Sequence, residues 1–262
     1  MSGDFYAEIA PIYDRMIRWP RRLALEEPLF AAIWRRSGAR SVLDAACGSG
    51  RHLVLFAGQG LTVSGADASG AMLALAREQA DTLPEPRRPR LVHSAWAELP
   101  DKISETFDAV LCLGNSLPYV TEPGALHDSL RGLWSRVAPG GFLLIQFRNF
   151  ARMRVRGECF LPLSSLVDPR GGAEYVSVRQ YEWHERTVDF NVIMLSNERR
   201  SPDSPWTLNH WTTPLATYRV SDVSDPLVSL GARTELYGSL GLEPYDETNS
   251  EDVVIWAQRS GQ

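Results

Sequence analysis

Cysteine is scarce in this sequence, since only three are present among 262 residues and tens of residues separate them. An odd number at such spacing fits neither a disulfide framework nor the Cys-x-x-Cys pairs of a zinc site. We therefore expect no bound metal, and we expect the protein to work in a reducing compartment, the cytoplasm.

Long apolar runs and an excess of positive charge are also missing. No apolar stretch is long enough to span a bilayer, and MSGDFYAEIAP at the start lacks the basic segment and apolar run of a secretory signal. Asp and Glu outnumber Lys and Arg by 32 to 27, which gives a formal net charge of −5. We therefore expect neither nucleic acid nor a membrane surface as a partner.

What the sequence does contain is an alternation of short apolar runs with amphipathic stretches between residues 41 and 147. This pattern is typical of a parallel α/β sheet. Strands are expected at 41–46, 61–67, 90–94, 107–113 and 141–147. Helices are expected at 51–58, at 71–80 and over the leucine-rich stretch 126–137, which should end at the stop signal APGG.

After residue 150 the pattern becomes strand-like, with polar or proline-containing breaks. Val188, Phe190, Val192 and Met194 alternate with polar residues, so one face of an antiparallel sheet should be buried there. The tail then predicts a helix at about 226–240 and a final strand at 252–258 that rejoins the main sheet. The middle portion is therefore expected to be an insertion.

The strongest single motif is VLDAACGSGRHLVLF, residues 42–56, in which Asp44 precedes Gly48-Ser49-Gly50 and a helix follows. Glycines let a ligand approach the backbone closely, and a helix start offers unpaired N–H groups. The third glycine of a dinucleotide site is replaced by Leu53, and the Gly-Lys-Ser/Thr of a phosphate loop is absent. Asp67, which ends the next strand, can accept both hydroxyls of a ribose, so a nucleoside ligand is indicated.

These motifs resemble the class I S-adenosylmethionine-dependent methyltransferases, whose first motif looks like DAACGSG and whose ribose-binding acid looks like Asp67. The resemblance covers roughly residues 22–150 and the terminal strand. It implies an α/β fold with a Rossmann-like, mostly parallel sheet, a final antiparallel strand, and an antiparallel β insertion after the fifth strand. It also implies S-adenosyl-L-methionine as the cofactor and S-adenosyl-L-homocysteine as the product.

The resemblance assigns donor contacts to several segments of the chain. Tyr6 and Tyr13 resemble aromatic lid residues, and Ala95-Trp96 would hold the adenine. Arg22 stands 22 residues before Asp44, the spacing of an arginine that binds the methionine carboxylate; only this spacing favours it over Arg21. The full predicted set is Tyr6, Tyr13, Arg22, Asp44, Ala46, Gly48, Gly50, Asp67, Ala68, Met72, Ala95, Trp96 and Leu113.

The stretch CLGNSLPYV, at 112–120, and the Arg-Asn pair after the fifth strand resemble glycine and glycine/sarcosine N-methyltransferases. By that resemblance Asn115 orients an amine through its side-chain carbonyl, and Arg148 fixes an anionic group of the acceptor. Tyr119, which stands where those enzymes have a histidine, would help to close the pocket. Together with the unexpected Pro118, this departure leaves the acceptor's identity open.

The predicted organisation has four segments, namely a helical lid at 1–40, the donor-binding core at 41–150, the β-rich insertion at 151–220, and a helix and strands at 221–262 that complete the sheet. The insertion is expected to help bind substrate or to join subunits of a homo-oligomer.

The predicted function is methyl transfer by direct displacement to a small molecule, with a glycine-like or natural-product amine as first choice. O-methylation is the alternative, with His210 as the base that an oxygen nucleophile needs. A module that binds the donor without turnover is a second alternative. A nucleotide-dependent oxidoreductase is disfavoured by the missing third glycine.

Overall fold

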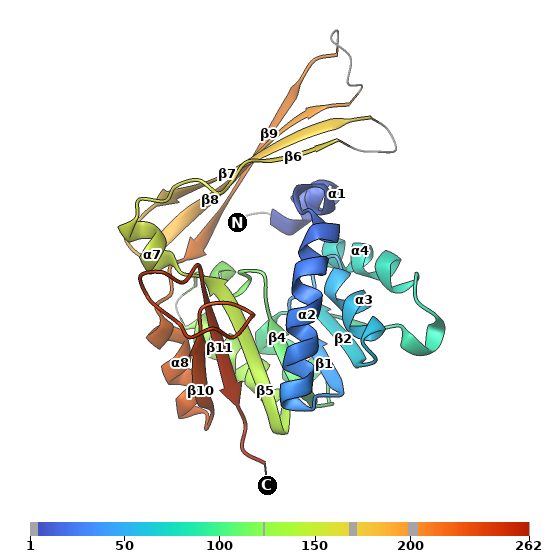
Figure 1. Cartoon of the computed structure of the whole chain (residues 1–262), viewed down its shortest axis with the longest axis vertical. Helices are drawn as coiled ribbons and strands as arrows, with labels where there is room; N and C mark the ends of the chain where they lie inside the picture. Colours follow the sequence, from blue (N-terminus) through green and yellow to red (C-terminus); the bar gives the residue numbers. More distant parts are fainter. Residues whose placement is uncertain (1–4, 123, 168–171, 199–203, 262) are drawn as a thin grey trace.

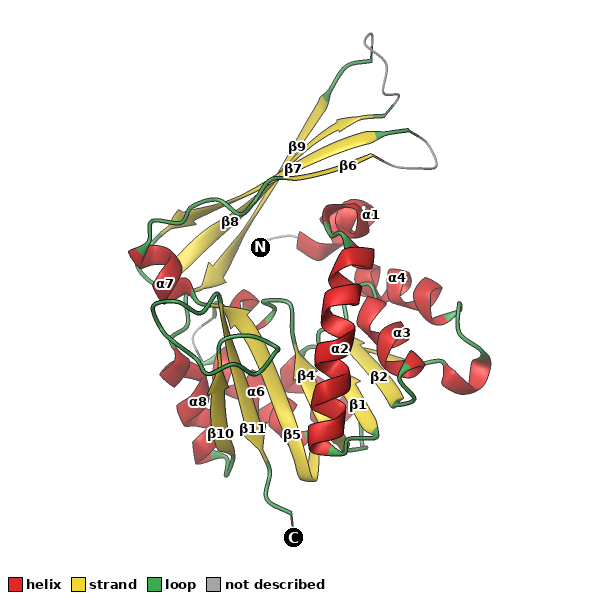
Figure 2. Ribbon diagram, viewed as in Figure 1, coloured by secondary structure: helices red, strands yellow, loops and turns green. Residues whose placement is uncertain are grey.

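A computed structural model describes residues 5–122, 124–167, 172–198 and 204–261. A seven-stranded sheet carries helices on both faces, and a separate four-stranded sheet lies beyond the carboxyl ends of its parallel strands (Figures 1 and 2). The first four residues of the predicted lid lie outside the described residues. Within the described ranges, no helix combines the length and the apolarity needed to cross a bilayer.

The main sheet has the strand order β10-β11-β5-β4-β1-β2-β3. Its strands are β1 (Ser41–Asp44), β2 (Thr62–Asp67), β3 (Arg90–His93), β4 (Phe107–Cys112), β5 (Val137–Arg148), β10 (Arg233–Tyr237) and β11 (Asp252–Gln258). Strand β11 is antiparallel to both β5 and β10, and the other neighbours are parallel. The predicted fold class is therefore confirmed. Strand order reverses at β1, and in such sheets ligands bind beyond the carboxyl ends of the strands at that point.

Helices cover both faces of this sheet. On one face α2 (Trp19–Ser37), α3 (Arg51–Gly58) and α4 (Gly70–Ala80) contribute to a cluster with buried Phe30 and Phe56. The other face is covered by α5 (Leu99–Lys102), α6 (Ala125–Ser135) and α8 (Val220–Ser229). Three short 3₁₀ turns are η1 (Glu85–Arg87), η2 (Trp96–Glu98) and η3 (Leu117–Tyr119). Burial on both faces explains why the central strands read as continuous apolar runs.

The second sheet, called the insertion sheet below, follows β5 in the chain. It runs β6 (Ser164–Val167), β7 (Glu174–Trp183), β8 (Thr187–Asn197) and β9 (Thr207–Ala216), all antiparallel, after the short helix α7 (Phe150–Val155). The first helix, α1 (Phe5–Met16), packs Phe5 and Ile9 against Val192 and Met194 of this sheet. Helix α1 therefore lies between the insertion sheet and the core (Figure 1).

Two predicted element boundaries were wrong. The APGG segment lies inside β5, because Gly141 passes so close to β4 that a Cβ there would be 2.7 Å from the Asp108 carbonyl. The helix predicted at about 226–240 is α8, which begins at Val220 and ends at Ser229. Asp222 explains the early start, since its carboxylate accepts the Arg219 N–H at 2.8 Å as an N-terminal cap. Among the remaining residues, Arg233–Tyr237 form edge strand β10.

Candidate active site

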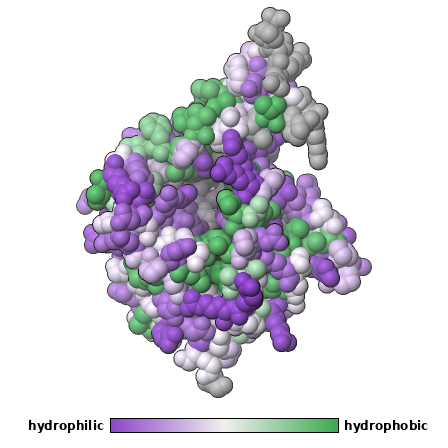
Figure 3. Space-filling model, in the orientation of Figure 1, coloured by the Kyte–Doolittle hydropathy of each residue, from purple (hydrophilic) through white to green (hydrophobic). Residues whose placement is uncertain are grey.

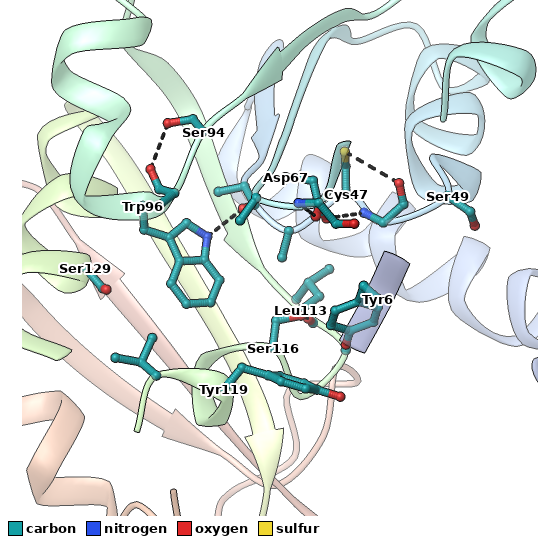
Figure 4. Close-up of a pocket in the computed structure, with 18 of the residues that line it drawn as sticks. Tyr6, Cys47, Ser49, Asp67, Ser94, Trp96, Leu113, Ser116, Tyr119 and Ser129 are labelled. Carbon is teal, nitrogen blue, oxygen red and sulfur yellow. Dashed lines mark hydrogen bonds between the residues drawn. The ribbon is translucent and has the colours of Figure 1, made fainter. Parts of the chain in front are cut away.

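A cavity of about 620 Å³ opens at the carboxyl ends of β1, β2 and β4, where the strand order reverses (Figure 4). We call it the donor cavity. Ten residues of the predicted donor set line it, namely Tyr6, Tyr13, Arg22, Ala46, Gly48, Asp67, Ala68, Ala95, Trp96 and Leu113. Its volume lies within the range of small-molecule and cofactor sites.

Asp67 is fixed in this cavity by backbone donors. Its Oδ2 accepts the Gly48 N–H at 2.8 Å, and its Oδ1 accepts the Ser69 N–H at 2.9 Å. Gly48 has a φ of 52°, a left-handed value that glycine adopts without strain. A carboxylate offers about four lone-pair sites, so Asp67 can also accept the hydroxyls of a sugar. The contacts fit a ligand with a ribose.

Trp96 forms a flat wall of the donor cavity. Its indole N–H donates to the Ala45 carbonyl at 2.6 Å, which fixes the ring plane. Gly132 of α6 permits this placement, because a Cβ there would lie 1.9 Å from the Trp96 carbonyl oxygen. Figure 4 shows the indole and Asp67 on one side of the cavity, with Tyr6 and Tyr119 on the other. A planar base can stack on such a wall.

Helix α1 is attached to the donor loop by Asp14, which sequence reasoning missed. The Asp14 carboxylate accepts the Ser49 hydroxyl at 2.7 Å and the Arg51 guanidinium at 2.6 and 2.9 Å. It also accepts the Trp19 indole N–H at 2.8 Å. An acid beside Tyr13 in an amphipathic helix carries no sequence signal for these partners. Asp14 thus holds the N-terminal segment over the loop that follows β1.

Arg22 extends from α2 to the mouth of the donor cavity. Its Nε donates to Glu26 at 3.0 Å, and its guanidinium lies 5.0 Å from the Trp19 ring centroid. Glu26 in turn pairs with His52 at 2.8 Å. This chain of contacts orients a cation at the cavity, in keeping with the predicted role of Arg22 toward a carboxylate.

Three predicted donor contacts lie behind the cavity wall. Asp44 is 1% exposed and accepts the Ala46 N–H at 3.3 Å, and burial raises its pKa to about 6. Gly50 has a φ of 80° and lets α4 approach, since a Cβ there would lie 2.8 Å from the Ala76 Cα. Buried Met72 lies beside Gly48. These residues shape the loop from behind and are not among those lining the cavity.

The lining also includes residues that the sequence analysis did not single out. Their shared feature is a position in the turn after a core strand or at the start of α2 or α6. They include Trp19, Ser94 and Ser129, whereas Ser49 and Ser116, which also line the cavity, belong to motifs that the sequence analysis quoted. Isolated serines in turns are too common for sequence alone to assign them to a site.

A second cavity, of about 650 Å³, lies between the core, α1 and the insertion sheet, and we call it the acceptor cavity. Figure 3 shows the surface hollowed in this region, with hydrophilic residues on the rim. Tyr6, Tyr13, Arg22, Gly114 and Tyr119 line both cavities. The two spaces therefore adjoin across these residues.

Asn115 and Arg148 lie together in the acceptor cavity. Asn115 has a φ of 63°, and its Oδ1 accepts the backbone N–H of Arg148 at 2.9 Å. Asparagine adopts this left-handed conformation more readily than most residues. The Asn115 side chain thus connects the turn after β4 to the end of β5, and its oxygen keeps one lone pair for a ligand.

The Arg148 guanidinium is already paired with acids. It lies 3.0 Å from Asp252 and 3.9 Å from Glu251. Burial raises the pKa of Asp252, an effect that Arg148 opposes. The positive charge of Arg148 is therefore largely balanced within the protein.

Three tyrosines line both cavities where the two spaces adjoin. The ring centroids of Tyr6 and Tyr119 are 5.1 Å apart, and those of Tyr6 and Tyr13 are 6.1 Å apart. Burial raises the pKa of Tyr13 to about 12 and also raises the pKa values of Tyr6 and Tyr119. All three hydroxyls are therefore neutral near pH 7 and unsuited to act as bases.

His210 lies on the outer face of β9, where it is exposed and its ring contacts Asn191 Oδ1 at 3.0 Å. It lines neither the donor cavity nor the acceptor cavity. Strand alternation accounts for this, because the inward positions of β9 are Trp211 and Thr213. The structure thus does not bring His210 to the other predicted catalytic residues.

Comparisons with known proteins agree with this geometry. Residues 42–141 match the methyltransferase domain family. The chain is 34% identical over 138 residues to the glycine/sarcosine N-methyltransferase of Aphanothece halophytica, which covers 53% of this chain and 51% of that protein. The chain thus spans about half the length of the curated relatives it matches.

Solved structures extend the likeness over nearly the whole chain. An S-adenosylmethionine-dependent methyltransferase from Clostridium acetobutylicum ATCC 824 superposes with a TM-score of 0.75 at 16% identity, covering 98% of this chain and 99% of that one. CalS10, an amino pentose methyltransferase from Micromonospora echinaspora solved with S-adenosylmethionine bound, gives 0.69 at 22% identity over 96% and 95%. Residues 42–141 thus match a methyltransferase domain, and the chain as a whole has the fold of the class I S-adenosylmethionine-dependent methyltransferases.

Proposed function

We propose that this protein transfers a methyl group from S-adenosylmethionine to the amine of a small molecule. The observation that carries this proposal is that the donor and acceptor cavities adjoin across Tyr6, Tyr13 and Tyr119. A direct displacement needs donor and acceptor on opposite sides of the transferred group, and adjoining cavities supply that arrangement.

On the donor side, each part of S-adenosylmethionine has a candidate partner. Asp67 would accept the ribose hydroxyls, Trp96 would stack on the adenine, and Arg22 would bind the methionine carboxylate. The bound sulfonium supplies an electrophilic methyl group. Tyr6 and Tyr13 cover the cavity and exclude water from it.

On the acceptor side, we propose that Asn115 and Tyr119 orient the amine and that Arg148 closes the far wall. An amine needs no base in the protein if it arrives unprotonated. Neutral tyrosine hydroxyls can hydrogen-bond the uncharged amine, and they carry no negative charge that would favour its protonated form. The contribution of the protein is therefore alignment, which holds the nucleophile close to the methyl group.

N-methylation is favoured over O-methylation by Tyr6, Tyr13 and Tyr119, which lie where the two cavities adjoin. An oxygen nucleophile would need a base there, but the tyrosines are neutral and His210 lies elsewhere. The relatives point the same way, since one is named as a glycine/sarcosine N-methyltransferase and CalS10 acts on an amino pentose. Both a small amino acid and an amino sugar are therefore candidate acceptors.

Two measurements test the proposal. In a thermal-shift screen, S-adenosylhomocysteine should raise the melting temperature and NAD should not. With donor labelled in its methyl group, label should appear on at least one amine in a panel of amino acids, amino sugars and phenols. Label only on phenols would show O-methylation in place of the proposed N-methylation. Donor binding without label on any acceptor would favour a module that binds the donor without turnover. Stabilisation by NAD alone would refute the proposal.

Other predictions from the sequence are kept as proposals. They are that the protein works in the cytoplasm, binds no nucleic acid and forms a homo-oligomer. The insertion sheet exposes Trp206 and Leu208, which are 48% and 63% accessible, and such residues could join subunits. Light scattering on the purified protein would test the oligomer.

A further inference from the structure

Arg179 occupies an inward position of the insertion sheet. It follows Tyr175 and Ser177 and precedes Tyr181 at alternate positions of β7, and these three neighbours are 4%, 3% and 2% exposed. Alternate residues of a strand face the same side, so Arg179 faces the protein interior. It lines the acceptor cavity, and the residue opposite it on β8 is the fully buried Val192.

The Arg179 side chain has no acidic partner among the described residues. Its Nε is buried without a hydrogen-bond partner, and the charged or titratable groups that act on it are Tyr181 and Arg148. The hydroxyl of Ser177, two residues earlier on the same face, is also buried and unpartnered. Arg179 is partly exposed toward the cavity, and a partly desolvated cation without a counter-charge is unfavourable, so the residue calls for an explanation.

The other arginines of the acceptor cavity differ from Arg179. Arg148 is paired with Asp252 and Arg22 with Glu26, which uses both acids that line the cavity. Arg18 donates to the Ser165 carbonyl at 2.9 Å, and Arg21 is exposed to solvent. The uncompensated charge inside the cavity is therefore that of Arg179, on the wall made by the insertion sheet.

We propose that Arg179 binds an oxyanion, a carboxylate or a phosphate, carried by the acceptor amine. The inference rests on the proposed function and deepens it. A guanidinium can hold an oxyanion through two parallel N–H donors, and charge-assisted bonds of this kind are strong in a desolvated site. The anionic group is thereby assigned to the insertion sheet and not to Arg148, beside which two acids, Asp252 and Glu251, already lie.

The size of the cavity adds to the description of the acceptor. A volume of about 650 Å³ lies within the range that drug-sized ligands occupy. Asn115 lies on the core wall of this cavity and Arg179 on the insertion wall. An acceptor that reaches both walls has its amine and its oxyanion on separate parts of the molecule. The substrate class is an amine larger than glycine with a remote acidic group.

Anion binding tests this assignment without turnover. Acetate, inorganic phosphate and neutral acetamide are titrated into the S-adenosylhomocysteine complex by calorimetry. We expect acetate or phosphate to bind and acetamide not to, and Arg179→Met to weaken the anion about tenfold to a hundredfold. Arg179→Lys, which keeps the charge and loses the fork, should be intermediate. The two anions distinguish a carboxylate site from a phosphate site.

The matched control is Arg186→Met, which removes an exposed arginine in the turn between β7 and β8 that lines neither cavity. Its anion affinity should equal that of the wild type. Equal affinity in wild type and Arg179→Met, or a loss seen only in Arg148→Met, would overturn the assignment. A structural role for Arg179 would instead lower the melting temperature of Arg179→Met, whereas removal of an unpaired buried charge should leave it unchanged or raise it.

A turnover arm separates this inference from the proposed function. Acceptor pairs that differ only in a carboxylate or its amide are compared with labelled donor. Arg179→Met should raise the KM for the acid about tenfold to a hundredfold, the factor expected for the anions, and leave the KM for the amide unchanged. If no acceptor is methylated but the anion still depends on Arg179, the proposed function fails and the anion site stands. If methylation occurs with no preference for the acid, the anion site fails alone.

Discussion

The donor and acceptor cavities are built in different ways. On the side of the sheet, the donor cavity is formed by the ends of core strands and the turns after them, and the backbone N–H groups of Gly48 and Ser69 fix Asp67 there. Helices α1 and α2 complete the cavity. The acceptor cavity is assembled from segments far apart in the chain, such as Arg148, Arg179 and Asp252. Short sequence motifs can therefore hold the donor, whereas the identity of the acceptor depends on side chains that only the tertiary packing brings together.

The largest expected effect concerns Asp44, which supports the donor loop from behind. Burial raises its pKa from 3.8 to about 6, so the folded state favours the protonated form. Its contribution to stability is present below about pH 4 and is lost as the pH rises through about 6. The unfolding free energy of Asp44→Asn relative to wild type should therefore increase by about 3 kcal/mol from about pH 2 to about pH 8, of which about 2 kcal/mol falls between pH 4 and pH 6.

Urea unfolding of both proteins across this pH range measures the difference. Exposed Asp81→Asn serves as the control and should show no such change. A pH-independent difference for Asp44→Asn would mean that the buried carboxyl is not destabilising the donor half. Asp44 would then not affect the donor cavity through the stability of the fold.

Asp67 should have the next largest effect, on donor affinity. Asp67→Ala removes the acceptor of the Gly48 and Ser69 N–H groups as well as the proposed ribose contact. Bonds to a charged group are worth about 1.5–3 kcal/mol, so S-adenosylhomocysteine should bind about tenfold to a hundredfold more weakly. Calorimetric titration measures this. Undiminished affinity would show that Asp67 does not bind the donor and that the donor is not held by this strand end.

Asp14 tests whether the lid belongs to the donor half. Asp14→Ala frees α1 from Ser49 and Arg51. Because the freed helix must then be ordered when the donor binds, donor affinity should fall by about threefold to thirtyfold. Asp14→Asn keeps an acceptor for Ser49 and Trp19 and should lose less. The same titration ranks the two variants. If Asp14→Asn lost as much as Asp14→Ala, the charge on Arg51 and not the hydroxyl contact would hold the lid.

The same contrast explains what the sequence could predict. The sequence predicted that Asp67 and Trp96 would lie at the donor cavity, which both of them line, because Asp67 ends β2 and Trp96 follows β3 by three residues. In this type of sheet, ligands bind at such carboxyl ends of strands. Asp14 and Arg179 were missed because their importance depends on partners, or the lack of them, that only tertiary packing determines. His210 was misplaced for a related reason, since a strand predicted without its register does not reveal which face is inward.

The core sheet was predictable for the same physical reason as the donor site. Its strands are buried on both faces and read as apolar runs, whereas the edge strand β10 alternates weakly and was mistaken for helix. The Pro139-Gly140-Gly141 segment misled because a turn signal can also mark a strand irregularity. Local patterns thus fail where an element's surroundings are unusual.

The smallest expected effect concerns Asn115, which contributes both to structure and to the acceptor cavity. Asn115→Gly keeps the left-handed conformation and loses the bond to the Arg148 N–H, so stability should fall by about 1 kcal/mol. Asn115→Ala should lose about 1 kcal/mol more, because alanine is strained at that φ. Both variants should bind S-adenosylhomocysteine as the wild type does while the acceptor KM rises. Equal losses of donor and acceptor affinity would instead show that the turn after β4 serves both cavities, and that the two halves of the site are less separate than their construction indicates.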